Sequence, residues 1–428
     1  MNSAHTDSSA RAAAARRPFV VMAKPVGSAC NMRCAYCYYL NTPGSSPVGR
    51  MSREVLAQMI RSYIQASEGP VVSFTWHGGE PMLAGLDFYR EAVALEKAYL
   101  PEGWECWNSL QTNGLALDDE WCDFLAEAKF DVGVSLDGTQ AIHDAFRADA
   151  GGSPTYARIA ANVARLQARG IQPDLLCTVT STTAAHGREV YRALRDLGTG
   201  WMQFIPIVRR NASGAVSPDS VAPRQYGSFL KDVFAEWIFH DLERAEVQLF
   251  SEMALVLSGQ PANLCWMRET CGHVPVIEKD GGVYACDHFV RPEYRVGSVL
   301  KDDLAALMAA GPQLDFGLAK RDGQTAYCLA CPWRKLCNGG CPKDRFAATP
   351  DGEPGQYYLC EGLRDFFAYA VPRLTAAMRL SAQRKSQREI MAELVRQERE
   401  RCKGVSRNDP CPCGSGAKFK SCCQKRVP

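Results

Sequence analysis

The sequence predicts an α/β protein with a partial, open (β/α)6 barrel of parallel strands, followed by a cysteine-rich domain and a small metal-binding tail. Between residues 19 and 207, short apolar stretches alternate six times with amphipathic stretches of helical period. This alternation is typical of parallel βαβ units, and six units leave open a barrel that eight would close. Most of the 19 cysteines lie beyond residue 260, which predicts a separate metal-rich region.

The strands and helices follow one another with polar motifs at the strand ends, where such folds carry their chemistry. The expected strands are Phe19–Met22, Val71–Trp76, Cys106–Gln111, Val132–Leu136, Leu175–Val179 and Met202–Ile207. The expected helices are Ser52–Ile64, Leu86–Leu100, Asp118–Ala128, Thr155–Arg169 and Arg188–Leu197, then a connecting helix Pro223–His240 and a charged helical stretch Arg379–Arg401 with a solvated face.

A metal-binding loop is predicted directly after the first strand. Cys30, Cys34 and Cys37 are spaced three and then two residues apart, so three thiolates can lie on one small loop. A zinc site needs a fourth ligand, whereas a 4Fe–4S cluster held by three thiolates keeps one iron open for a small molecule. The alternatives are a zinc loop completed from elsewhere, or three unrelated cysteines.

The cysteine loop resembles the signature of the radical S-adenosylmethionine (SAM) enzymes, including Tyr36 just before the last cysteine. The resemblance implies a TIM-like partial barrel in which SAM chelates the open iron. In Gly78-Gly79-Glu80-Pro81, the glycines permit close backbone approach to a ligand, and Glu80 can accept a hydrogen bond from an ammonium group. A similar run binds the methionine amino group of SAM in that family.

Two further SAM contacts are implied by the same resemblance. Ser135, at the end of the fourth strand, and Arg158, on the following helix, correspond to contacts with the SAM ribose or carboxylate. The alternative interpretations are a loop serine and a solvated helix arginine.

Eight downstream cysteines match the ligand demand of two fully ligated 4Fe–4S clusters, although a pair of zinc sites would satisfy the same spacing. The region resembles the SPASM domain of peptide-modifying radical SAM enzymes in its two-cluster form. Carried over from that family, one cluster is held by Cys265, Cys271, Cys286 and Cys341, and the other by Cys328, Cys331, Cys337 and Cys360.

From about Val20 to about Phe367, the chain resembles the anaerobic sulfatase-maturating enzymes. The most specific element is Tyr284-Ala285-Cys286-Asp287-His288-Phe289. In that family an aspartate beside an auxiliary-cluster cysteine is the catalytic base, and Asp287 occupies this place. A carboxylate beside a low-dielectric cluster suits a general base. The alternative is a capping or turn carboxylate.

The resemblance implies a radical SAM oxidoreductase that converts a cysteine or serine of an unfolded sulfatase to Cα-formylglycine. A 5′-deoxyadenosyl radical would abstract hydrogen from Cβ, with a flavodoxin- or ferredoxin-type electron donor. One rival is a SPASM maturase that forms thioether or carbon–carbon crosslinks in a ribosomal peptide. Such enzymes often carry an N-terminal leader-recognition domain, for which the residues before the first strand are too few. Another rival is a zinc-dependent adaptor without catalysis.

The net charge of +2 is unevenly distributed. From Arg373 onward there are 14 Lys and Arg against 5 Asp and Glu, so the body is acidic and the C-terminal part basic. Nothing in the body indicates a nucleic-acid footprint. No signal peptide and no apolar run of membrane-spanning length is found, so a cytoplasmic location with reduced, metal-binding thiols is expected, without a membrane partner.

The C-terminal cysteines predict a second kind of metal site. Cys411, Cys413, Cys422 and Cys423 offer four thiolates with tetrahedral zinc spacing, and the run resembles the SEC-C zinc motif. Because a segment this short cannot bury a hydrophobic core, it should fold only when zinc is bound. The motif implies an added docking function. The expected divisions are a disordered tail 1–17, the barrel 18–240, the SPASM domain 241–372, a charged helical linker 373–407 and the zinc motif 408–428.

Overall fold

The computed structural model describes residues 18–40, 42, 44–46, 48–211, 213–413 and 416–426. The predicted N-terminal tail, residues 1–17, lies outside the described residues. The chain forms two compact units. Unit 1 comprises Met1–Ser135, Asp144–Pro173 and Glu269–Gly323, and unit 2 comprises Leu136–His143, Asp174–Arg268 and Gln324–Pro428. No helix among the described residues is long and apolar enough to cross a membrane.

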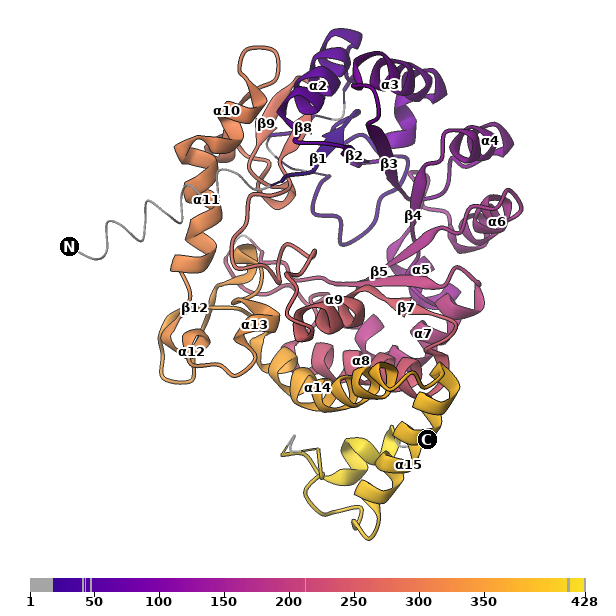
Figure 1. Ribbon diagram of the computed structural model, residues 1–428, viewed down its shortest axis with the longest axis vertical. Helices are drawn as coiled ribbons and strands as arrows, with labels where there is room; N and C mark the ends of the chain where they lie inside the picture. The colour runs from indigo at the N-terminus through magenta and orange to yellow at the C-terminus, as the bar shows by residue number, and fades with distance from the viewer. Residues whose placement is uncertain are drawn as a thin grey trace, which may run out of the picture. The chain divides into compact units, whose positions relative to one another are not determined.

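Unit 1 contains a sheet whose strand order is β10-β9-β8-β1-β2-β3-β4 (Figure 1). Strands β1 to β4 are parallel and in chain order, as the βαβ pattern predicts, and β8 also pairs in parallel with β1. Strands β9 and β10 extend this edge in the antiparallel sense. The strands are β1 (Val21–Lys24), β2 (Val71–Trp76), β3 (Glu105–Thr112), β4 (Asp131–Ser135), β8 (Val276–Glu278), β9 (Gly282–Tyr284) and β10 (Arg295–Ser298).

The helices of unit 1 begin where the sequence supplies caps. The Ser52 hydroxyl accepts from the Val55 amide at the start of α2, and the Asp118 carboxylate accepts from the Trp121 amide at the start of α4. The helices are α2 (Arg53–Ala66), α3 (Leu86–Tyr99), α4 (Asp119–Glu127), α6 (Tyr156–Gln167), α10 (Leu304–Ala309) and α11 (Gly311–Asp322); α5 (Gln140–Phe146) has residues in both units. One-turn helices occur at η1 (Pro81–Ala84), η4 (Asp287–Phe289) and η5 (Pro292–Tyr294).

Unit 2 contains the parallel strands β5, β6 and β7 and a helical layer in which α8 and α14 pack together. Phe234 of α8, Phe250 of α9 and Phe366 of α14 form its aromatic centre. The elements are β5 (Asp174–Val179), η2 (Thr183–His186), α7 (Gly187–Asp196), β6 (Trp201–Pro206), α8 (Pro223–Glu236), β7 (Glu246–Val247), α9 (Gln248–Leu257), α12 (Ala326–Leu329), α13 (Arg334–Cys337), η6 (Pro342–Asp344), β11 (Ala347–Ala348), β12 (Pro354–Gln356), α14 (Cys360–Ala382), α15 (Gln387–Cys402), η7 (Phe419–Ser421) and η8 (Cys423–Lys425).

Two helical predictions differ from the structure. The connecting helix predicted to reach His240 ends as an α-helix at Glu236 and continues as a π-helical turn, η3 (Trp237–Asp241). The single charged helix expected over Arg379–Arg401 is two helices, because α14 ends at Ala382 and Ser386 starts α15 with a capping box. The α15 face is also partly buried, since Ile390 and Leu394 lie in the core.

Candidate active site

The loop with the first three cysteines follows β1 in unit 1 and is fastened to the segment after α5. The Arg33 amide donates to the Ala148 carbonyl at 2.9 Å, and the Ala35 amide donates to the Phe146 carbonyl at 2.9 Å. Burial, with smaller contributions from the nearby Glu80, Cys34 and Cys37, raises the pKa of the Cys30 thiol to about 11. The three predicted ligands therefore lie together on one partly buried loop, where the thiol form of Cys30 is favoured in the absence of a metal.

The glycine loop after β2 lies directly against the cysteine loop. The Gly79 amide donates to the Gly27 carbonyl and the Glu80 amide to the Ala29 carbonyl, both at 2.8 Å. A Cβ at Gly79 would lie 2.1 Å from the Ala29 carbonyl oxygen, so no other residue fits there. Gly78 has a φ of +137°, which also favours glycine.

The Glu80 side chain is completely buried and satisfied by protein donors. Its carboxylate accepts from the Met82 amide at 3.1 Å, the Thr112 hydroxyl at 2.8 Å and the Asn113 amide at 2.7 Å. Burial raises its pKa to about 7, although these three hydrogen bonds favour the ionised form. In this structure Glu80 therefore fixes the glycine loop to the end of β3.

Asn113 is a site residue that the sequence analysis did not single out. Its side-chain nitrogen lies 3.7 Å from the Cys30 sulfur and 2.7 Å from the Asn31 side-chain oxygen. It thus joins the end of β3 to the cysteine loop. The available signal was its place in a polar run at a strand end.

The remaining predicted SAM contacts all lie in unit 1. The Tyr36 ring is buried 5.9 Å from the Phe146 ring. Ser135 is the last residue of β4, and its hydroxyl accepts from the Gln111 side chain at 3.2 Å. Arg158, on α6, donates to the Asp149 carboxylate at 3.0 Å and keeps 57% of its side chain exposed.

Asp287 is held at the start of η4 by a cation and a phenol. The Lys24 ammonium lies 2.5 Å from one carboxylate oxygen, and the Tyr38 hydroxyl donates to the other. Burial by itself raises the pKa of Asp287, but the Lys24 ammonium above all outweighs it and holds the pKa well below its usual range. Asp287 is therefore a partly buried carboxylate that is ionised at neutral pH.

Lys24 links this carboxylate to the glycine loop. It is fully buried, it lies 4.4 Å from the centre of the Tyr39 ring, and its ammonium is 3.2 Å from Nδ1 of His77. The same Nδ1 accepts from the Gly78 amide at 2.7 Å, and burial followed by Lys24 lowers the pKa of His77 to about 3. The His77 ring is thus neutral and accepts at Nδ1. The sequence analysis missed Lys24, whose only signal was a lysine beside an apolar strand.

One predicted set of auxiliary ligands is gathered in unit 2. Burial, with smaller contributions from the neighbouring Cys337, Cys328 and Cys331, raises the pKa of the Cys360 thiol to about 12. These four sulfurs thus lie close enough to repel one another as thiolates. The members of the other predicted set are Cys271 and Cys286 in unit 1 and Cys265 and Cys341 in unit 2.

The four C-terminal cysteines also come together. Their sulfurs all lie within 4.8 Å of one another, and Cys413 is 3.4 Å from both Cys411 and Cys422. Four sulfurs at this separation fit the donor set of a structural zinc ion.

Comparison with known proteins agrees with this arrangement. The family model for the Radical SAM superfamily matches residues 25–197, and that for the SEC-C motif matches residues 407–425. The serine-type anaerobic sulfatase-maturating enzyme of Bacteroides thetaiotaomicron is 37% identical over 374 residues, which cover 83% of this chain and 90% of that protein. This chain belongs to the anaerobic sulfatase-maturating enzyme family.

Members of both named types of this family match the chain. The cysteine-type anaerobic sulfatase-maturating enzyme of Clostridium perfringens is 32% identical over 366 residues, covering 83% of this chain and 97% of that protein. The solved structure of native anSMEcpe with bound AdoMet and Cp18Cys peptide has a TM-score of 0.77 and 32% identity, and covers 84% of this chain and 98% of that one. The predicted radical SAM fold and the predicted class of radical SAM oxidoreductase are confirmed.

Proposed function

We propose that this enzyme oxidises a cysteine or serine side chain of an unfolded sulfatase polypeptide to Cα-formylglycine. The observation that carries the proposal is the partly buried Asp287 carboxylate, which the buried Lys24 joins to the glycine loop beside Cys30 in one unit. When bound, the first cluster and SAM supply a 5′-deoxyadenosyl radical that takes a hydrogen atom from the target Cβ.

In this proposal, different residues of unit 1 bind the first cluster and SAM. Cys30, Cys34 and Cys37 hold the 4Fe–4S cluster that keeps one iron open for SAM. Glu80 fixes Gly78 and Gly79 so that their backbone receives the SAM amino group. Tyr36, Ser135 and Arg158 complete the SAM site.

Asp287 is the general base of the proposed reaction. After the target Cβ has lost a hydrogen atom, Asp287 accepts the proton of the substrate thiol or hydroxyl. The auxiliary clusters, when bound, would accept the one electron that must leave the substrate. Serine gives the aldehyde directly, whereas cysteine gives a thioaldehyde that water hydrolyses with release of sulfide. A flavodoxin- or ferredoxin-type protein is the proposed electron donor for the first cluster.

The cysteine-rich part of the chain holds the remaining metals in this proposal. Two auxiliary 4Fe–4S clusters take the two sets of four cysteines, and the grouping of Cys360 with Cys328, Cys331 and Cys337 supports the second of these sets. Zinc occupies the C-terminal motif. The division into a barrel at 18–240, a SPASM domain at 241–372, a linker and a zinc motif is part of the same proposal.

Activity on a peptide tests the function directly. Anaerobic incubation with SAM, a reductant and a short sulfatase-motif peptide is expected to yield an aldehyde that hydrazine reagents trap, with 5′-deoxyadenosine as the co-product. Mass spectrometry of the trapped peptide measures it. A peptide with an internal crosslink and no aldehyde would instead identify a peptide-crosslinking maturase.

The proposed function also predicts the metal content of the protein. Three 4Fe–4S clusters require about 12 irons per chain, and the tail requires about one zinc. Iron, sulfide and zinc analysis of anaerobically purified protein measures this. A value near four irons per chain would contradict the two auxiliary clusters.

Replacing Lys24 tests whether the base depends on its buried partner. Lys24→Met leaves the Asp287 carboxylate without its counter-charge and free to shift, and a displacement of about 1 Å can cost about 10²-fold in rate. Formylglycine formation should fall by that order, with partial rescue by Lys24→Arg, in a single-turnover assay by mass spectrometry. Lys97→Met, at an exposed lysine of α3 in the same unit, is the matched control. Equal activity of the two methionine variants would contradict the role of Lys24.

A further inference from the structure

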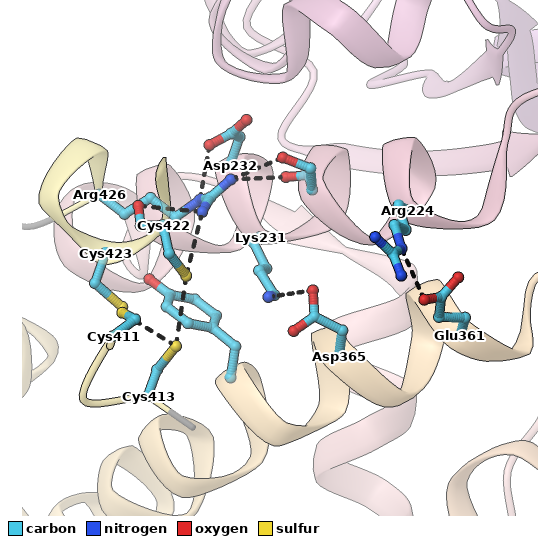
Figure 2. A network of polar contacts seen from close by, with 12 residues as sticks. Arg224, Lys231, Asp232, Glu361, Asp365, Cys411, Cys413, Cys422, Cys423 and Arg426 are labelled. Atoms are coloured by element: carbon cyan, nitrogen blue, oxygen red, sulfur yellow. Dashed lines mark hydrogen bonds and ion pairs between the residues drawn. The ribbon is translucent and has the colours of Figure 1, made fainter. Parts of the chain in front are cut away.

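The C-terminal arginine anchors the metal motif to helix α8 of the same unit (Figure 2). Arg426 is buried, with 4% of its side chain exposed. Its guanidinium donates to the Asp232 carboxylate at 2.8 Å, and to the hydroxyl and carbonyl of Ser228 at 3.0 and 3.3 Å. Such a set of charge-assisted contacts in a buried place fixes both position and orientation.

The same guanidinium also faces the cysteines. Its other terminal nitrogen donates to the Cys422 carbonyl at 3.3 Å and lies 4.0 Å from the Cys422 sulfur. Figure 2 shows Arg426 between Asp232 on one side and the cysteines on the other. The arginine is therefore shared between α8 and the motif.

Two more arginines approach the motif from α14 and α15. Arg373 of α14 and Arg401 of α15 place guanidinium nitrogens 3.7 and 3.9 Å from the Cys423 sulfur, and both pair with Glu398 of α15. Arg373 has 6% of its side chain exposed and lies 3.7 Å from the centre of the Tyr369 ring. Helices α14 and α15 thus meet at the motif.

The balance of charge around the four sulfurs calls for an anionic metal centre. The three guanidiniums face two carboxylates, those of Asp232 and Glu398, so one positive charge is left over. The Nε atoms of Arg373 and Arg401 are buried without a hydrogen-bond partner. Four thiolates around a divalent cation carry a net charge of −2 and accept hydrogen bonds, which suits donors of this kind.

Helices α8 and α14 are already in close contact away from the motif. A Cβ at Gly362 would lie 1.8 Å from the Pro223 carbonyl oxygen, so the helices touch backbone to backbone there. Lys231 pairs with Asp365 at 2.5 Å, and the exposed Arg224 pairs with Glu361 at 2.7 Å. The motif adds a further connection in the middle of α14, where this helix carries Tyr369 and Arg373.

We propose that the C-terminal metal motif is an intramolecular clamp that fastens α8, α14 and α15 together, with Arg373, Arg401 and Arg426 as the charge partners of its thiolates. This inference rests on the proposed zinc site. It differs from the added docking function that the sequence motif implies, because the motif contacts helices of its own chain. Since α14 begins at Cys360, the clamp stabilises the helix that supplies a proposed auxiliary-cluster ligand.

The decisive variant is Arg426→Gln, with Arg224→Gln as the matched control. Loss of a partner in the outer shell of a metal site typically weakens metal binding about 10–100-fold. We expect a loss of this size for Arg426→Gln in a zinc competition with a chromophoric chelator. Arg224→Gln removes an exposed pair from the same helices and should leave the affinity unchanged. Asp232→Asn removes the partner of Arg426 but no residue of the motif, and should weaken zinc binding in the same direction.

Hydrogen exchange supplies a readout that needs no enzyme activity. Stripping zinc from the full-length wild-type protein should speed amide exchange in α15, in the part of α14 around Tyr369, and in α8 around Asp232. Faster exchange confined to residues 408–426, or equal zinc affinity of Arg426→Gln and Arg224→Gln, would overturn the clamp. A wild-type protein that binds no zinc would overturn the zinc site itself.

Discussion

Asp287→Asn should lower formylglycine formation by about 10²–10⁴-fold, the usual contribution of a general base. The change keeps the size of the side chain and removes the carboxylate that Lys24 and Tyr38 hold. SAM cleavage depends on the loop of Cys30, Cys34 and Cys37 and should fall far less. The measurement is the ratio of formylglycine to 5′-deoxyadenosine in one anaerobic reaction.

The control for this variant makes the same chemical change nearby. Glu293→Gln alters an exposed carboxylate six residues further along the chain and should leave both products unchanged. Equal loss of both products in Asp287→Asn would place Asp287 in support of the cluster or SAM. Unchanged formylglycine formation would show that Asp287 is a turn residue and not the base.

Replacing Cys30, Cys34 and Cys37 together with alanine should abolish SAM cleavage. Without these thiolates no cluster with an open iron can form beside the glycine loop. The variant should lose about a third of the iron and keep the rest, because the auxiliary ligands are untouched. Iron analysis and a 5′-deoxyadenosine assay measure the two effects.

Cys106→Ala is the control, because Cys106 lies in unit 1 and belongs to none of the predicted ligand sets. It should retain both the iron and the cleavage activity. Continued SAM cleavage by the triple variant would show that the open-iron cluster lies elsewhere in the chain. Loss of all iron would show that the auxiliary clusters depend on the first one.

The strand and helix periodicity was sufficient to predict β1 to β6 and the helices α2 to α4, α6 and α7 to within a few residues. Most of the elements that were not predicted are short, because three or four residues do not display a period. The strands β8 to β10 and the helices α12 and α13 are of this kind. The longer helices α9 and α11 were also not predicted. The end of α14 was also not predicted. The pattern of charges in this part of the chain is typical of one continuous helix, but a capping box at Ser386 starts a second helix there.

The chemistry that depends on spacing along the chain was determined by the sequence itself. A loop brings residues that are close in sequence together in almost any fold. The sequence alone therefore indicates the chemistry of three motifs: three cysteines on one loop, two glycines before Glu80, and four cysteines in the last 18 residues. Comparison with known proteins confirmed the fold and the enzyme class that these motifs indicated.

Only the tertiary structure decided which distant residues support that chemistry. Lys24 and Asp287 lie far apart in the sequence, and β1 pairs with β8 to bring their side chains within 2.5 Å of each other. Arg426 reaches Asp232 only because α8 and the C-terminus pack in the same unit. The sequence does not distinguish a buried lysine from a solvated lysine. The difference between them is the loss of water, and that loss depends on which parts of the chain pack together.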